Sequence, residues 1–126
     1  MILNPQQNAD SLKIPKDIYL RILGKAVSQT QVDIKDMETA LPIADFDKIQ
    51  SISHRWKGDY DNMRITTLSM VARALNQEVK ASRDKEKIIA FLTQFKNMFF
   101  MNDEEMNFIS NINDNKSKSK KQQKLR

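Results

Sequence analysis

The chain has 126 residues, of which 40% are hydrophobic, and it carries a formal net charge of +5. It contains no cysteine and only one histidine, which excludes disulfides, thiolate zinc sites, cysteine nucleophiles and histidine-rich metal sites, and we expect no cofactor. Two glycines and three prolines are too few for the many turns of an all-β fold, so the composition favours one helical domain.

The positive charge is concentrated at the C-terminal end. Residues 111–126 carry six basic side chains and one acidic side chain, which accounts for the whole net charge. The rest of the chain is therefore neutral and does not predict a nucleic-acid-binding face. We expect residues 111–126 to form a disordered basic tail, the one segment through which nucleic acid would be a partner.

Nothing in the sequence predicts a membrane segment. The N-terminus has no basic stretch followed by an apolar run of signal length. The longest apolar stretch, residues 98–101, is far below the roughly 20 residues that span a bilayer. We therefore expect a cytoplasmic protein without membrane insertion.

The first half of the chain predicts an irregular lead-in and two helices. Residues 1–13 lack helical periodicity. Pro15 suits the first turn of a short helix, and Gly24 is expected to end it. A second helix is predicted over residues 26–41, after which Pro42 interrupts the pattern because it has no N–H to donate.

The second half predicts three amphipathic helices. Apolar residues recur at steps of three and four over residues 44–63, 65–81 and 85–100. Ser82 or Asp84 is expected to cap the last of these helices. Short connections between amphipathic helices favour antiparallel packing of neighbours.

These elements together predict an all-α fold, an antiparallel four-helix bundle with short helices added at its N- and C-terminal ends. The bundle is expected over residues 14–110, between the lead-in and the basic tail. Acidic residues from Asp103 onward are typical of a helix start, and we expect the added C-terminal helix there.

The only histidine, His54, lies on the predicted helix over residues 44–63. On a helical wheel it points about 130° away from the apolar stripe, so we expect the imidazole to face solvent. Gly58 follows one turn later on nearly the same line. Because a glycine inside a helix costs about 1 kcal/mol relative to alanine, it predicts clearance for a molecule that docks here. Lys57 is placed to pair with a phosphoryl group on the ring, and a neutral imidazole is a competent nucleophile.

The stretch His-Arg-Trp-Lys-Gly at residues 54–58 resembles the signature of histidine-containing phosphotransfer (HPt) domains. In that family a helix reads roughly Ala-His-x-Leu-Lys-Gly, and the likeness extends over about residues 14–100. The resemblance implies that His54 accepts the phosphoryl group, that Lys57 is the phosphate-side lysine and that Gly58 provides clearance.

The resemblance also implies a function, that of a phosphorelay intermediate in two-component signalling without catalytic machinery of its own. His54 would accept a phosphoryl group from the aspartate of a response-regulator receiver domain, or from a hybrid sensor histidine kinase, and pass it to another receiver. Mg²⁺ is expected on the partner receiver domain and not on this chain. We expect Arg55, Asp61 and Arg64 to join Lys57 at the docking surface.

The chain departs from the family pattern at several positions. Trp56 stands where leucine is usual, Asp59 and Tyr60 where small residues are usual, and Arg64 where glycine is usual. One alternative is a non-catalytic helical adaptor with a degenerate site, in which His54 is incidental and the bundle surface or the basic tail binds protein partners. Another is a nucleic-acid accessory protein that acts through the tail.

Overall fold

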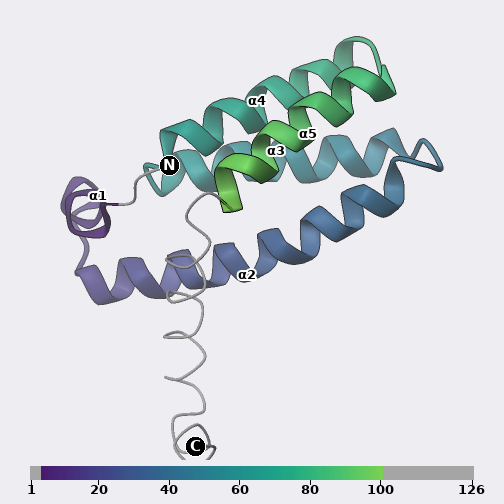
Figure 1. Ribbon diagram of the computed structural model, residues 1–126. Helices are drawn as coiled ribbons and strands as arrows, with labels where there is room; N and C mark the ends of the chain where they lie inside the picture. Colours follow the sequence, from purple (N-terminus) through teal and green to yellow (C-terminus); the bar gives the residue numbers. More distant parts are fainter. Residues whose placement is uncertain (1–3, 101–126) are drawn as a thin grey trace, which may run out of the picture.

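The computed structural model describes residues 4–100, and this part of the chain is all helical, as the composition predicts (Figure 1). Within it, five helices follow one another and no strand occurs. The helices are α1 (Pro5–Leu12), α2 (Lys16–Ala40), α3 (Phe46–Asn62), α4 (Thr66–Ala81) and α5 (Lys85–Phe100). The predicted C-terminal helix and the basic tail lie outside the described residues.

Helix α1 corrects the prediction of an irregular lead-in. The side chain of Asn4 accepts a hydrogen bond from the backbone N–H of Gln7 at 3.1 Å, and Pro5 occupies the first helical position. Both features start helices, because they satisfy or remove backbone donors that have no partner there. Ala9 is fully buried, so this short helix is held by packing as well as by its cap.

Helix α2 is one continuous helix, and the predicted break at Gly24 is wrong. Gly24 is buried in the interior of the helix, between the fully buried Leu23 and Val27. Its backbone keeps the helical conformation because the packing of these neighbours outweighs the modest cost of a helical glycine. The helix ends at Ala40, next to Pro42, which agrees with the predicted interruption.

The last three helices have nearly the predicted bounds. Asp45 caps α3 by accepting a hydrogen bond from the N–H of Lys48 at 3.2 Å. Asp84 takes the corresponding place before α5, where its carboxylate accepts from the N–H of Glu86 at 3.0 Å. In each case the acidic cap stands directly before the apolar repeat, which is why the sequence locates the start so well.

The centre of the core is aromatic. Trp56 and Tyr60 from α3 meet Phe95 and Phe99 from α5, and all four side chains are at most 1% exposed. The Trp56 and Phe95 rings are stacked with centroids 4.1 Å apart. Burial of each large side chain contributes about 2–3 kcal/mol from area alone. This cluster fixes the inward face of α3 and therefore also determines which face is left for solvent.

Every connection between the described helices contains one residue with a left-handed backbone, and none of these residues is a glycine. They are Lys13, Ala44, Arg64 and Arg83, with φ between 53° and 64°. A side chain makes this conformation unfavourable by roughly 1 kcal/mol or more. Gly24 and Gly58 both lie within helices, where this freedom is not used.

Candidate functional site

His54 is exposed on the solvent face of α3, as the wheel predicts. The buried side chains of Ile49, Ser53, Trp56 and Tyr60 occupy the opposite side of the helix. Because that side is anchored by the aromatic core, α3 cannot rotate without exposing Trp56. The imidazole is therefore held outward by the packing of the helix that carries it.

A solvent-open hollow of about 450 Å³ lies beside the imidazole. We call it the His54 hollow, and it is lined by Asp47, Gln50, Ser51 and His54 from α3 and by Asn76 and Lys80 from α4. Most of these side chains can donate a hydrogen bond. The lining is thus suited to a small anionic group placed on the ring of His54.

Polar side chains of α4 bind α3 on the flank of the hollow. Asn76 is 2% exposed, and its amide nitrogen donates to the backbone oxygen of Gln50 and to the hydroxyl of Ser53, both at 3.1 Å. Two turns away, the Ser69 hydroxyl donates to the backbone oxygen of Lys57 at 3.1 Å. These bonds fix α4 against α3 and so determine where the next turn of α4, which carries Lys80, stands relative to His54.

Gly58 follows His54 by one turn and has open space where a side chain would be. A Cβ placed on Gly58 would meet no heavy atom within 4 Å. Its backbone is in the ordinary helical region, so neither internal packing nor backbone conformation requires a glycine. The remaining explanation for a glycine at this position is the open space outside the helix, next to the imidazole. This observation agrees with the predicted role in clearance for a docking molecule.

Two of the other residues predicted for the docking surface also lie near this face. Lys57 is partly exposed and stands three residues after His54, and its backbone oxygen accepts from Ser69 of α4. Asp61 is exposed and stands one turn after Gly58. The structure therefore keeps His54, Lys57, Gly58 and Asp61 on one stretch of accessible helix surface.

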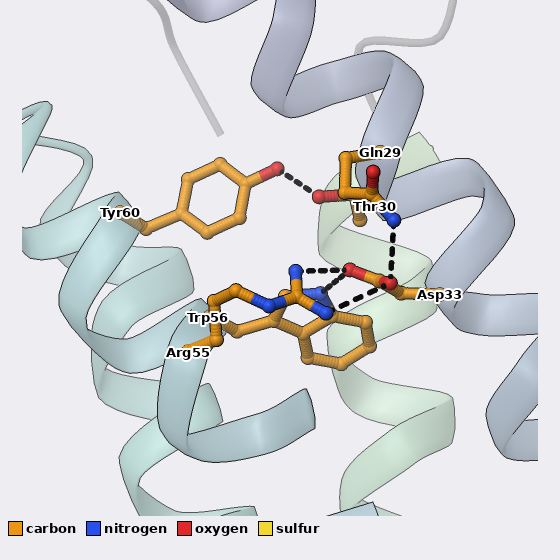
Figure 2. A network of polar contacts seen from close by, with 6 residues as sticks. All are labelled: Gln29, Thr30, Asp33, Arg55, Trp56 and Tyr60. Atoms are coloured by element: carbon orange, nitrogen blue, oxygen red, sulfur yellow. Dashed lines mark hydrogen bonds and ion pairs between the residues drawn. The ribbon is translucent and has the colours of Figure 1, made fainter. Parts of the chain in front are cut away.

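Arg55, whose side chain is 43% exposed, does not stand free at this surface. Its guanidinium donates two hydrogen bonds to the buried carboxylate of Asp33 on α2, at 2.8 and 3.1 Å (Figure 2). Trp56 Nε1 donates to the same carboxylate at 2.9 Å, and the side-chain nitrogen of Gln29 also donates to it, at 3.0 Å. The charge of Arg55 is thus already paired inside the protein.

These contacts set the charge state of the pair. Burial alone raises the pKa of the Asp33 carboxyl, but hydrogen bonds from Arg55, Gln29 and Trp56, together with the Arg55 charge, outweigh burial and leave this pKa below its ordinary value. The hydrogen bonds to Asp33 raise the pKa of Arg55. Both groups therefore stay ionised at neutral pH, and the network joins α2 to α3 through a buried charge.

Arg64 is also engaged elsewhere. It lies in the turn after α3, and its Nε donates to the hydroxyl of Ser11 in α1 at 3.1 Å. It stands ten residues beyond His54, more than two helical turns away, and does not line the His54 hollow. The docking role predicted for Arg64 therefore has no support in its contacts.

The sequence reasoning missed the other five residues that line the hollow beside His54, Asp47 and Ser51 among them. Gln50 lies one turn before His54 on α3, and Asn76 and Lys80 come from α4. The α4 pair is spaced by four residues, so both face the same way on a helix. A short turn between α3 and α4 requires antiparallel packing, and that register was the available signal for their approach.

Comparison of the chain with known protein families, with characterised proteins and with solved structures finds no match. Within residues 4–100, no group of three or more acidic, histidine or cysteine side chains is arranged to hold a metal ion. None of the described helices is long and apolar enough to cross a bilayer.

Proposed function

We propose that the chain is a cytoplasmic histidine-containing phosphotransfer protein that carries a phosphoryl group on His54 between response-regulator receiver domains. The observation that carries the proposal is the outward imidazole of His54 followed, one turn later, by a glycine with empty space in front of it. A docking partner needs both an accessible nucleophile and an unobstructed helix surface around it.

The arrangement of the helices supports the proposal. Helices α2 to α5 form an antiparallel four-helix bundle in this reading, with α1 as the added N-terminal helix. The imidazole of His54 lies in the middle of α3, away from both ends of the helix, so the bundle holds it in a fixed position. A rigid element holds a reacting group more accurately than a loop does.

The transfer requires little of this chain beyond presentation. A ring nitrogen lone pair of neutral His54 attacks the phosphorus of the partner's aspartyl phosphate, and a P–N bond forms as the P–O bond breaks. The aspartate carboxylate leaves with the bonding electrons, and the imidazolium loses its other ring proton to solvent. The reverse sequence passes the group to the next receiver. Mg²⁺ and the acidic cluster that holds it belong to the partner.

The direct test is labelling of His54. The wild-type protein and His54→Gln are incubated with phosphorylated receiver domains and Mg²⁺, and separately with phosphoramidate, a small phosphoryl donor that needs no docking surface. We expect acid-labile, base-stable label on the wild type alone, with equal helical content by circular dichroism. Label that survives in His54→Gln, or a wild type that takes no label from either source, would overturn the proposal.

Gly58→Ala separates phosphotransfer from a non-catalytic adaptor role. Because the added methyl group meets nothing inside the protein, we expect the helix to gain about 0.5–1 kcal/mol in stability. Transfer from a receiver should fall by about tenfold through a clash at the docked surface, while labelling by phosphoramidate stays at the wild-type rate. An unchanged receiver rate would contradict the clearance role and favour the adaptor.

A further inference from the structure

The His54 hollow takes its lysine from a different helix than the one that carries His54. Lys80 on α4 is the only basic side chain that lines it. The only acid in the lining, Asp47, is 89% exposed and forms a surface ion pair with Arg83 at 3.2 Å. Among the described residues, Lys80 makes no ion pair of its own. The hollow therefore contains an unpaired ammonium facing the same space as the imidazole.

The other cations that the sequence suggested are less able to serve the site. Arg55 is bound twice to Asp33, and moving it would leave a buried carboxylate without its partner. Arg64 is bonded to Ser11 at the far end of α3. Lys57 remains, but it does not line the His54 hollow. Lys80 alone among the lysines and arginines of the described residues lines the hollow beside the imidazole.

Resting on the proposed function, we propose that Lys80 is a phosphoryl-binding residue, whose ammonium pairs with the phosphoryl oxygens once the group is on His54. An ammonium on a flexible four-carbon stem can follow the group as it arrives and leaves. Pairing with a dianion stabilises the phosphorylated protein relative to the free one. Asn76, one turn before Lys80, holds this part of α4 against α3 through its bonds to Gln50 and Ser53.

Two consequences can be measured. Without the ammonium, the phosphorylated state is less favourable, so the equilibrium with a receiver shifts toward the aspartyl phosphate. The phosphoryl group also loses a contact that restrains it, so we expect its hydrolysis from the ring to be faster. We expect each effect to be about threefold to tenfold, as is typical of one charge-assisted contact at a partly solvated site.

The experiment uses the full chain labelled on His54 by phosphoramidate and freed of donor, so that no receiver is needed. The phosphohistidine half-life is compared for wild type, Lys80→Gln, Lys80→Arg and Lys57→Gln. Lys35→Gln is the matched control, because it removes an exposed helical lysine outside the hollow. We expect a half-life threefold to tenfold shorter for Lys80→Gln, a value near wild type for Lys80→Arg and Lys35→Gln, and a smaller difference in 1 M salt.

The outcomes separate the two proposals. A wild-type protein that takes no label contradicts the phosphotransfer function itself. A labelled wild type with an unchanged half-life in Lys80→Gln overturns only the role of Lys80, and a loss confined to Lys57→Gln would assign the phosphoryl group to Lys57 instead. Recovery in Lys80→Arg distinguishes charge pairing from a structural effect, since the arginine keeps the charge with a different shape.

Discussion

The two sides of α3 are joined to their neighbours in different ways. On the α4 side, short side chains reach the backbone of α3, as Ser69 does at Lys57 and Asn76 at Gln50. A serine hydroxyl can reach a backbone oxygen of another helix only where the two helices are in close contact. On the α2 side the links are long side chains, and Figure 1 shows α2 lying apart from α3 along much of its length.

The α2 side combines buried apolar side chains with a few specific polar contacts. The Asp33 carboxylate binds Arg55 and Trp56 of α3, and the hydroxyls of Thr30 and Tyr60 meet at 2.6 Å (Figure 2). Burial raises the pKa of Tyr60, which keeps it a neutral phenol able to hydrogen bond. The candidate site is thus built on the close α3–α4 pair, while α2 adds to its buried apolar face a polar network that a single substitution can disrupt.

The largest expected effect is at Asp33. Asp33→Ala leaves the guanidinium of Arg55 and the indole N–H of Trp56 without their acceptor, and we expect a loss of about 3 kcal/mol in unfolding free energy. This is below the largest values for buried pairs because the Arg55 side chain is 43% exposed. Urea unfolding measures it, with Ser69→Ala as the counterpart on the α4 side, expected to cost less than about 1 kcal/mol. Equal losses would contradict the contrast between the two interfaces.

The second effect is a pH dependence of the unfolding free energy, which is seen only in acid. The pKa of Asp33 is lower in the folded chain than in the unfolded chain, so its stabilising contribution is complete above the ordinary carboxyl pKa of about 4 and is lost as pH falls through the folded-state pKa. Asp33→Asn imitates the protonated side chain. The stability difference between wild type and Asp33→Asn should therefore narrow below about pH 4 in urea titrations. A difference that stays constant down to pH 2 would show that Asp33 is not the responsible group.

The smallest effect should be a gain on the α4 side. Arg64 has φ of 64° in the turn that joins α3 to α4, where the N–H of Ile65 bonds back to the oxygen of Tyr60 at 2.9 Å. This is the position after a helix where glycine is favoured. We expect Arg64→Gly to raise the unfolding free energy by about 1 kcal/mol. Thermal unfolding checks it, and a lower midpoint would mean that the bond to Ser11 matters more than the backbone strain.

The sequence predicts the helices best where start signals and apolar spacing coincide. Asp84 stands next to a regular apolar repeat and α5 begins where expected, whereas α3 begins at Phe46, two residues after the expected start and directly after Asp45. The failures came from glycine and proline. Gly24 suggests a helix end, although its neighbours pack on both sides. The cap formed by Asn4 and Pro5 does not stand out in the sequence, because an eight-residue helix has too few apolar residues to show a period.

For the candidate site, the sequence predicts what a single helix determines. The outward direction of His54 and the position of Gly58 follow from helical geometry alone. The ion pair of Arg55 does not follow from helical geometry, because its partner Asp33 lies 22 residues away on another helix. Lys80 is likewise brought to the hollow only by the packing of α4, so a local motif contains no information about it.

The contacts of α2 also bear on the order in which the chain folds. The bonds from α2 to α3 join residues 22 to 30 positions apart, and those from α4 to α3 join residues 12 to 26 positions apart, the nearest being Ser69 and Lys57 across a tight turn. Nearby segments meet first because less chain entropy is lost in closing the loop between them. We expect α3 and α4 to pair early and α2 to dock late, after the folding transition state. The Asp33 contacts would then mainly lower the rate of unfolding, with little effect on the rate of folding. They would therefore determine how long a molecule stays folded once it has formed.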